Sequence, residues 1–256
     1  MKPLLKYRGG KSRELPHLIK HIPQNYDTYF EPFLGGGALF FHLEPERAII
    51  NDINSKLISF YNSVKYDFDK LKKELLEIER IYNSNRRVFE ELKSMTPEKR
   101  VEDRNESFYY EMRDMFNELT PKKYSDALLY FFINKTAYSG MIRYNARGEF
   151  NVPYGRYSNL NTSLVTEAHR KLLASTEIYN LDYSEIFKMA TKDDFMFLDP
   201  PYDCVFSDYG NVEHKDGFNE KNHIELANRY KNLKCKALMV IGRTPLTEKL
   251  YGSYIV

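Results

Sequence analysis

The chain has 256 residues, which suits one large domain or two small ones. Hydrophobic residues make up 42% of it, so a sizeable core can form and wholesale disorder is excluded. The 38 basic and 36 acidic side chains nearly cancel, and a net charge of +2 neither requires nor excludes a polyanionic partner. No apolar run approaches the roughly 20 residues that span a bilayer, and the first residues lack the apolar stretch of a signal peptide. We therefore expect an intracellular protein without a membrane partner.

The charge is distributed unevenly along the chain. Residues 1–24 contain six basic side chains and one acidic one, and residues 134–160 contain four and one. Residues 199–220 have the opposite balance, with six acidic side chains and one basic. Each basic segment by itself is as compatible with a solvated surface as with an anionic partner. The two cysteines, Cys204 and Cys235, have no metal-ligand spacing, and we expect no metal site.

The chain begins its regular structure as strand, turn, helix and strand. Residues 29–30 are a short apolar step, residues 34–37 are glycine-rich, and residues 38–41 are apolar, which predicts a strand, a turn and a helix. Residues 47–52 predict the next strand, which ends in Asp52. This β-α-β order predicts a parallel sheet with ligand sites at the carboxyl ends of its strands.

The middle of the chain is charged and periodic in the manner of helices. Residues 55–133 place apolar side chains at helical spacing, with breaks at 96–97 and 120–121, and predict a mostly helical insertion between strands. Residues 134–160 lose this periodicity and are rich in turn residues. The remaining predicted elements are a helix at 165–173 and strands at 177–182, 195–198 and 236–241, the first of these strands ending in Asp182.

The run Asp199-Pro200-Pro201-Tyr202 directly follows the apolar residues 195–198. Each proline fixes φ, restricts the residue before it and lacks an N–H, so this backbone is rigid and offers acceptors. The Asp199 carboxylate and the Pro200 carbonyl are then two acceptors held close together, which suits a substrate with two donor hydrogens, such as an amino group. The Tyr202 ring adds a face for stacking on a planar base. The alternative is a structural turn with an aspartate cap.

The glycine-rich turn at 31–37 lets a ligand approach the backbone at the start of a helix. A tight strand-to-helix turn explains these glycines equally well, and the full dinucleotide-binding pattern is absent. Asp52, at the end of the next strand, is placed to bond ribose hydroxyls, so the pair favours a nucleoside-type ligand on a Rossmann-like sheet. Residues 9–12 resemble the end of a P-loop, but Leu5 stands where that motif needs glycine.

Four segments, taken in order, resemble the Dam-like family of DNA adenine-N6 methyltransferases. They are KYRGGK at 6–11, EPFLGGGALF at 31–40, RYNARGEFNVPYGRY at 143–157 and DPPY at 199–202. Two shorter segments, NDIN at 51–54 and NLDYSEIF at 180–187, fit the lesser motifs between them. The resemblance covers nearly the whole chain.

The resemblance implies S-adenosylmethionine as the cofactor. Asp52 would bind its ribose hydroxyls, and Asp182 would bind its adenine amino group. The full set of residues implied for cofactor binding is Tyr7, Lys11, Phe33, Gly35, Gly37, Asp52, Asp182 and Asp199.

The resemblance also implies a mechanism at the DPPY motif. Asp199 and the Pro200 carbonyl would draw the hydrogens of the adenine amine out of the ring plane, which localises its lone pair toward the methyl group. Transfer is then an in-line displacement aided by orientation, and it needs neither a metal nor an enzyme nucleophile. An amine inside a duplex is out of reach, so the base must flip, with Tyr202 stacking on it and Pro201 completing the rigid motif.

Residues 134–160 are implied to form the hairpin that reads double-stranded DNA. Arg143 would contact guanine in the major groove, and Tyr138 would wedge beside the target base. GATC is the favoured recognition sequence, although Ser139 stands where relatives that read GATC often have asparagine. The full predicted DNA-binding set is Lys135, Tyr138, Ser139, Arg143, Arg147, Pro153, Arg156 and Tyr157, with weaker contacts from Lys2 and Arg8.

These implications define the expected architecture. We expect a Rossmann-like methyltransferase domain from residues 1–54 and 161–256, and a helical target-recognition domain from residues 55–160. The family pattern continues with a further strand or hairpin, so residues 254–256 are expected to lie in a strand and the sheet to lack its last element. A prokaryotic or phage-encoded, cytoplasmic, DNA-associated enzyme is expected, with a cognate restriction endonuclease as a partner that the family allows.

Two other functions are compatible with parts of this pattern. An enzyme that methylates another amine, on RNA or on protein glutamine, also carries a DPPY-like pocket. The segment at 134–157 and the order of the motifs favour DNA over these substrates. A DNA-binding relative that has lost catalysis is the second alternative, and the intact residues 199–202 argue against it.

Overall fold

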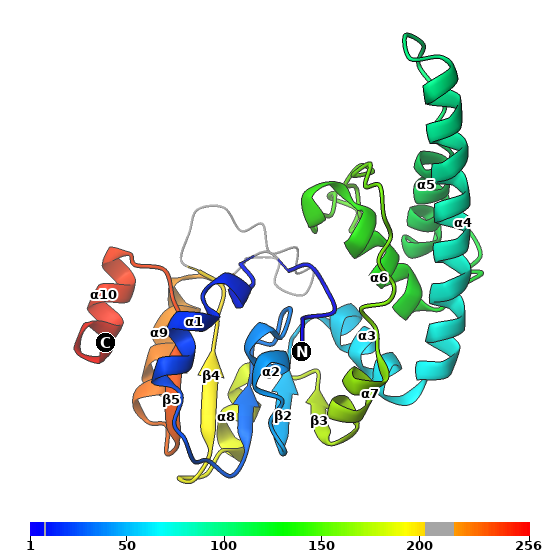
Figure 1. Ribbon diagram of the computed structural model, residues 1–256. Helices are drawn as coiled ribbons and strands as arrows, with labels where there is room; N and C mark the ends of the chain where they lie inside the picture. Colours follow the sequence, from blue (N-terminus) through cyan, green and yellow to red (C-terminus); the bar gives the residue numbers. More distant parts are fainter. Residues whose placement is uncertain (8, 203–217) are drawn as a thin grey trace.

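The computed structural model describes residues 1–7, 9–202 and 218–256. Within these residues the protein is built on a five-stranded sheet in the order β3-β2-β1-β4-β5, and every strand pair is parallel (Figure 1). This arrangement confirms the predicted Rossmann-like α/β class. The strands are β1 (Tyr29–Glu31), β2 (Ala48–Asn51), β3 (Thr176–Tyr179), β4 (Phe195–Leu198) and β5 (Lys236–Met239).

The strand order creates a topological switch point beside β1. From β1 the chain winds outward through β2 and β3, and it returns to the other side of β1 to form β4 and β5. Tyr29 of β1 stands opposite Ala48 of β2 and opposite Phe195 of β4, so the carboxyl ends of the three strands meet at one edge. Ligands of such sheets bind at this edge, next to the switch point.

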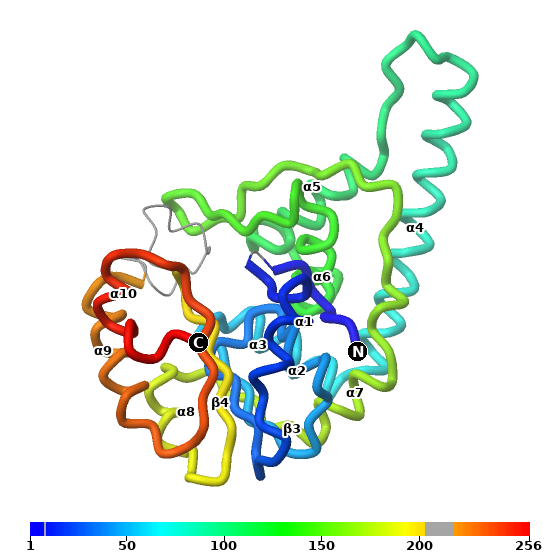
Figure 2. Tube along the Cα trace, turned by 60° about the vertical axis from the view of Figure 1, so that its left-hand side comes forward, coloured from blue at the N-terminus to red at the C-terminus, as the bar shows by residue number. Residues whose placement is uncertain are grey.

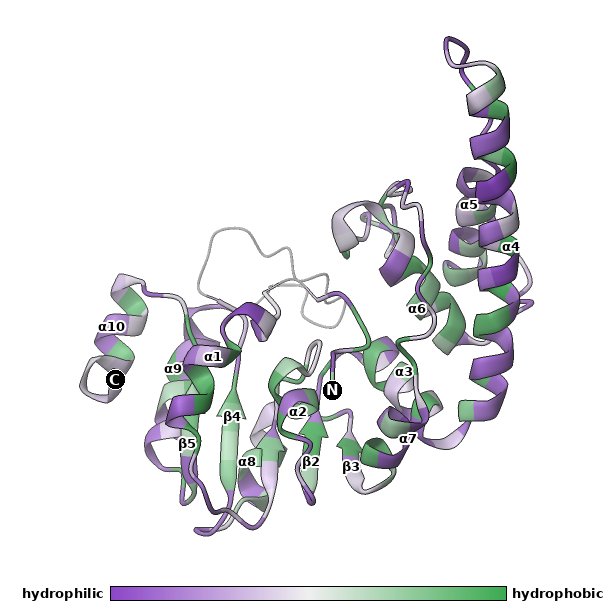
Figure 3. Cartoon of the chain, in the orientation of Figure 1, coloured by the Kyte–Doolittle hydropathy of each residue, from purple (hydrophilic) through white to green (hydrophobic). Residues whose placement is uncertain are grey.

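The central strands are buried over their whole length, and β4 is hydrophobic throughout. Every residue of β4 is buried, and so is every residue of β1. Strands of a parallel sheet are covered on both faces and therefore appear as continuous apolar runs, which is why the run at 195–198 predicts the bounds of β4 correctly. Figure 3 shows β4 coloured as hydrophobic, whereas the long helix α4 is largely hydrophilic.

The helices cover the sheet or stand beside it as a separate bundle. α8 and α9 pack on the sheet through Ile186 and Leu226, which share a buried cluster with Met196. α4 projects well beyond the rest of the molecule, with α5 alongside its lower part (Figures 1 and 2). The helices are α1 (Leu15–Leu18), α2 (Ala38–Leu43), α3 (Ser55–Tyr66), α4 (Phe68–Met95), α5 (Arg104–Phe116), α6 (Asp126–Thr136), α7 (Glu167–Ala174), α8 (Tyr183–Met189), α9 (Glu220–Lys231) and α10 (Pro245–Tyr251), with short 3-10 turns η1 (Lys11–Arg13), η2 (Ile19–His21), η3 (Tyr138–Gly140) and η4 (Gly252–Tyr254).

The predicted helical insertion is present as α3 to α6. α3 packs against α6 of this insertion and also against α7 and β3, so it joins the bundle to the sheet. None of the described helices combines the length and the apolar character that crossing a bilayer requires.

The segment after α6 contains a short antiparallel hairpin. Tyr144 forms a bridge with Phe150 across a turn at residues 145–149. The Tyr109 hydroxyl of α5 donates a 2.8 Å hydrogen bond to the Val152 carbonyl, which anchors the returning arm to the helical bundle. The hairpin is therefore supported by the helices on which it stands.

The sequence placed the start of the turn-rich segment too early. α6 continues to Thr136, so Lys135 lies on a helix. The reason is a buried polar contact: the Asn134 side chain accepts a 2.8 Å hydrogen bond from the Lys6 amide and donates a 2.7 Å bond to the Lys6 carbonyl. A polar residue thus continues the buried face of the helix, and the hydrophobic pattern does not reveal it.

Two strand predictions are also wrong. The strand at 177–182 ends at Tyr179, and Asp182 instead caps α8 by accepting a 2.9 Å hydrogen bond from the Ser184 amide. A side-chain cap of this kind bonds a backbone N–H group and so offers the backbone an alternative to pairing with a neighbouring strand. The residues at 254–256 form no strand, because Tyr254 closes a 3-10 turn and packs its ring on Tyr230 of α9.

Candidate active site

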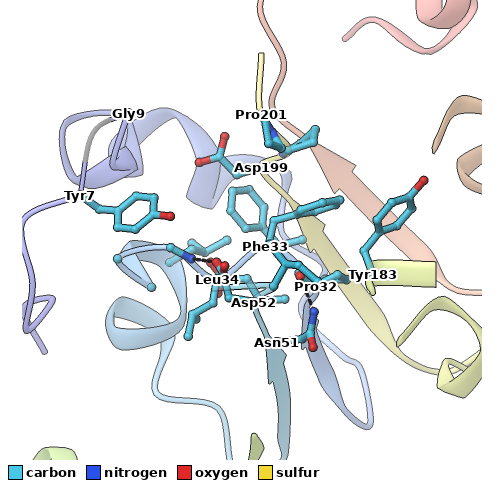
Figure 4. A pocket seen from close by; sticks show the side chains of 18 of the residues that line it. Tyr7, Gly9, Pro32, Phe33, Leu34, Asn51, Asp52, Tyr183, Asp199 and Pro201 are labelled. Atoms are coloured by element: carbon cyan, nitrogen blue, oxygen red, sulfur yellow. Dashed lines mark hydrogen bonds between the residues drawn. The ribbon is translucent and has the colours of Figure 1, made fainter. Parts of the chain in front are cut away.

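A cavity lies at the switch point, beside the carboxyl ends of β1, β2 and β4. Figure 4 shows Tyr7 on one side of it and Tyr183 on the other, with Asp199 and Asp52 between them. The structure brings together here all of the residues that the sequence predicts for cofactor binding, namely Tyr7, Lys11, Phe33, Gly35, Gly37, Asp52, Asp182 and Asp199.

The glycine turn forms the floor of the cavity and tolerates no side chains at key positions. Gly35 and Gly37 have φ values of +49° and +63°, which glycine adopts without strain. A Cβ atom on Gly35 would lie 2.9 Å from the Tyr7 ring. The close approach of Tyr7 therefore requires glycine at this position.

Asp52 supports this turn directly. One carboxylate oxygen accepts a 2.8 Å hydrogen bond from the Gly35 amide, and the other accepts a 2.9 Å bond from the Asn54 amide. The side chain is almost fully buried, with 7% of its surface exposed. Asp52 is thus a strut of the turn, and its predicted contact with ribose hydroxyls stays a prediction.

Asn51 is a supporting residue that sequence reasoning missed. Its side-chain amide donates to the Pro32 carbonyl at 2.9 Å and to the Leu181 carbonyl at 3.0 Å, and its oxygen accepts from the Leu181 amide at 2.8 Å. One buried side chain therefore ties the wall that follows β1 to the wall that precedes α8. Its place at the end of the predicted strand and at the start of the segment NDIN at 51–54 is the sequence signal that could have indicated it.

We expect Asn51→Ala to lower the free energy of unfolding by about 2–4 kcal/mol, because it leaves the buried Pro32 carbonyl and the partly buried backbone groups of Leu181 without partners. Urea denaturation followed by circular dichroism measures this loss. Asn180→Ala is the control, since the exposed Asn180 side chain also bonds two backbone carbonyls but water can replace it. An equal loss of stability in both variants would contradict the inference that Asn51 stabilises the fold by connecting Pro32 to Leu181.

Asp199 and Lys11 form a partly buried ion pair at the cavity, in which Lys11 is buried and Asp199 is half-buried. The Lys11 ammonium lies 2.7 Å from Asp199 Oδ2 and donates a 2.6 Å bond to the Gly9 carbonyl. Burial raises the pKa of Asp199 to about 6, although Lys11 counteracts part of this rise. Burial by itself lowers the pKa of Lys11, but Asp199 and Tyr202 together outweigh it and raise that pKa. The pair thus holds a carboxylate whose ionisation lies within reach of neutral pH.

The rest of the DPPY motif is divided between the cavity and its surroundings. Pro200 and Pro201 line the cavity next to Asp199. Tyr202 is not among the described residues that line it, and its ring centroid lies 5.1 Å from the Lys11 ammonium. Tyr202 is therefore near the acidic group but outside the cavity proper.

An aromatic wall closes the cavity on the side of α8. The Phe33 and Tyr183 rings lie 5.0 Å apart at an angle of 31°, and the edge of Phe218 meets Phe33 at 6.2 Å. Asp182 is exposed beside this wall. Apolar ring faces next to an exposed acceptor suit a planar heterocycle that carries an amino group.

The predicted DNA-binding residues cluster on the segment after α6. Tyr138 and Ser139 are exposed in the turn η3, and Ser139 has φ +55°, a value that asparagine adopts more readily than serine. The exposed Arg143 donates from Nε to the Asn151 side chain at 2.8 Å, which fixes the base of its guanidinium. Arg147 and Pro153 are exposed as well.

The remaining predicted contacts have partners within the protein. Arg156 lies 3.3 Å from Glu106 of α5. The Lys6 ammonium lies 3.7 Å from the centroid of the Tyr157 ring and donates to the Lys135 carbonyl at 3.0 Å. Burial and the nearby Lys6 lower the pKa of Lys135 to about 8. Arg8, which the sequence also suggested, lies outside the described residues.

A family assignment follows from comparison with known proteins. The model of the D12 class N6 adenine-specific DNA methyltransferases matches residues 7–256. The chain belongs to this family.

Individual relatives agree with the assignment. The chain is 34% identical to a type II methyltransferase, M.CviBI, of Paramecium bursaria Chlorella virus NC1A, over 100% of the chain and 88% of the relative. It is 35% identical to the type II methyltransferase M.MjaIII of Methanocaldococcus jannaschii, over 91% and 80%. It is 33% identical to the DNA adenine methylase of Escherichia coli K12, over 77% and 64%.

The methyltransferase is thus an adenine-specific enzyme that acts on DNA, as the sequence predicts. Its cavity lies where a parallel sheet places its ligands, and the ion pair between Lys11 and Asp199 borders it, Asp199 standing directly after β4. Among the described residues of the methyltransferase, no group of three or more histidine, cysteine or acidic side chains could hold a metal ion.

Proposed function

We propose that the methyltransferase uses S-adenosylmethionine to methylate the N6 amine of an adenine flipped out of duplex DNA. The observation that carries this proposal is the convergence of the glycine turn, Asp52 and the run Asp199-Pro200-Pro201 on one cavity at the switch point. The turn suits a nucleoside-type ligand, and the run suits an amine. One cavity can therefore bring donor and acceptor together.

The residues present fit S-adenosylmethionine. Gly35 lets the Tyr7 ring lie against the turn at the floor of the cavity, and the rings of Phe33 and Tyr183 offer faces to a purine. Asp182 is an exposed acceptor at the same end. Carboxyl groups outnumber ammonium groups in the described lining, which suits a ligand that carries a sulfonium and an amino group. When bound, this cofactor supplies a methyl group that needs no further activation.

The protein's own groups then act on the target amine. Asp199 and the Pro200 carbonyl accept its two hydrogens, which draws the amine out of conjugation and directs its lone pair toward the methyl donor. Lys11 favours the ionised form of Asp199 by pairing with it. The rigid proline backbone holds both acceptors in place, so much of the rate enhancement comes from orientation.

The rate of methyl transfer is expected to rise with pH through about 6 and to level off above about 7. The reason is that the ionised Asp199 is the acceptor, and its pKa of about 6 lies above that of a free aspartate. Initial rates between about pH 5 and 8.5, at saturating DNA, measure this profile.

Lys11→Met should move this rising limb to higher pH. The substitution removes the ammonium that lowers the Asp199 pKa, so a higher pH is needed to ionise the carboxyl group. A limb that keeps its position in Lys11→Met would contradict the assignment of the titration to Asp199.

The DNA interface is proposed on the hairpin and η3. Arg143, Arg147 and the exposed Tyr138 lie together on this segment, and the exposed position of Tyr138 supports its role as a wedge beside the flipped base. Tyr202 lies close enough to the Lys11–Asp199 pair to stack on a base held there. We propose GATC as the recognition sequence, and the type II names of two relatives support a cognate restriction endonuclease as a partner.

Sequencing the product of methylation on a random pool of duplex DNA tests this function. We expect N6-methyladenine in GATC, and we expect RNA of the same sequences to accept fewer methyl groups. Methylation of adenine in another sequence would overturn GATC alone. Methylation of RNA in preference to DNA would overturn the proposed target.

A further inference from the structure

Glu31 is a buried carboxyl group in the cavity that the mechanism above does not use. It ends β1, has 2% of its surface exposed and lines the cavity together with Asp52 and Asp199. The Tyr29 hydroxyl donates a 2.7 Å hydrogen bond to its Oε2. Packing does not explain why a carboxyl group is buried this deeply beside a ligand site, and buried carboxyl groups are typical of functional sites.

The surroundings of Glu31 disfavour its negative charge. Burial and the carboxylates of Asp199 and Asp52 raise its pKa to about 8, against the opposing effect of hydrogen bonds from Tyr29 and the Phe40 amide. The charge of Glu31 in turn contributes to the raised pKa of Tyr61 on α3.

The described lining of the cavity provides little positive charge that could stabilise an ionised Glu31. Lys11 is the one lysine or arginine among the described lining residues, and it is paired with Asp199. Asp182, the fourth carboxyl group of the described lining, is exposed beside α8. A buried carboxyl group is ionised when a cation pairs with it and is otherwise protonated, so a positive charge on a bound ligand would favour the ionised form of Glu31.

We propose that Glu31 matches the charge of the cavity to the charge on the cofactor's sulfur: its carboxyl group is protonated in the empty cavity and with the thioether product, and ionised with the sulfonium cofactor. This inference rests on the proposed use of S-adenosylmethionine. It makes Glu31 a specificity-determining residue that favours the sulfonium over the thioether.

The proton balance of the reaction agrees with this role. In transfer the carbon–sulfur bond would break with its electron pair left on sulfur, a carbon–nitrogen bond would form, and the amine would lose one proton to solvent. Glu31 takes up one proton from water as the positive charge leaves the sulfur. The cavity thereby loses its preference for the ligand just when that ligand has become product.

Isothermal titration calorimetry in two buffers of different ionisation enthalpy tests the inference without any turnover. The ligands are S-adenosylmethionine and S-adenosylhomocysteine at about pH 7, where Asp199 is largely ionised and the ligands' amino groups are largely protonated. The wild type should release close to one proton with the sulfonium ligand and close to none with the thioether.

Glu31→Gln keeps the size of the side chain and an acceptor for Tyr29. It should release no proton and should lose its preference for the sulfonium ligand by at least about tenfold, with the affinity for the thioether nearly unchanged. Asp182→Asn is the matched control, because it alters a carboxyl group near the shared adenine end. It should weaken both ligands alike and keep the proton release.

Tyr29→Phe provides a second variant should Glu31→Gln fold poorly. It removes a hydrogen bond that favours the ionised form, so it should weaken sulfonium binding more than thioether binding. Unchanged proton release in Glu31→Gln, or an equal loss for both ligands in either variant, would overturn the inference. A wild type that binds neither ligand would instead overturn the proposed cofactor, so the two failures are distinguishable.

Discussion

Asp199→Asn should reduce methyl transfer by about a thousandfold or more while the folded protein still binds its cofactor. The amide keeps the size of the carboxyl group but is uncharged and replaces one acceptor oxygen by a donor, so it accepts a hydrogen of the adenine amine much more weakly. It also removes the partner of Lys11, which then faces a neutral group at the same place. Single-turnover transfer of a labelled methyl group to duplex DNA measures the rate, and calorimetry measures cofactor binding.

The informative control for this variant is Asp182→Asn. Asp182 lines the same cavity at its other end, so its loss should weaken cofactor binding with a much smaller effect on the rate at saturation. The two variants would then distinguish an effect on the rate of methyl transfer from an effect on cofactor binding. Activity retained in Asp199→Asn would show that the amine is held elsewhere.

Arg143→Ala should reduce discrimination between the cognate site and a site with one altered base pair by about 1–3 kcal/mol, or roughly 5- to 150-fold. Arg143 is exposed on the hairpin and donates from Nε and Nη2 to Asn151, and we expect its guanidinium to contact guanine in the major groove. Competition between matched duplexes under single-turnover conditions measures this ratio.

Arg147→Ala is the corresponding control. Arg147 is exposed in the same hairpin and is predicted to contact phosphate, so its loss should weaken binding to all sequences alike. The slope of the logarithm of the DNA-binding constant against the logarithm of the salt concentration should become shallower by about one. If Arg143→Ala behaves in the same way as Arg147→Ala, then Arg143 contacts the backbone and another residue reads the base.

Local chemistry explains which features could be predicted from the sequence. The apolar run at 195–198 is typical of a strand in a sheet covered on both faces, and the prolines after it stop the strand. The bounds of β4, and the position of Asp199 directly after it, were therefore predicted correctly. The glycine turn and its helix follow from positive φ values that only glycine adopts freely. The order of motifs was sufficient for the family, because each motif is a short contiguous segment.

Features that depend on contacts between distant segments could not be predicted. Lys11 and Asp199 are 188 positions apart, and only the fold reveals that they pair and that burial raises the pKa of the aspartate. Asn51 connects two walls of the cavity because the fold brings the carbonyls of Pro32 and Leu181 to its side chain. Glu31 opens the motif at 31–40, but only the fold shows that its carboxyl group is buried in the cavity with Asp52 and Asp199.

The sequence by itself therefore determined most of the elements and the class of reaction. The tertiary structure decided their electrostatics, because the pKa of a carboxyl group depends on its burial and on which charges lie within a few ångströms. Glu31 shows the difference most clearly. Its burial at the end of β1, between Asp52 and Asp199, turns an unremarkable glutamate into a group that can respond to the charge of a ligand.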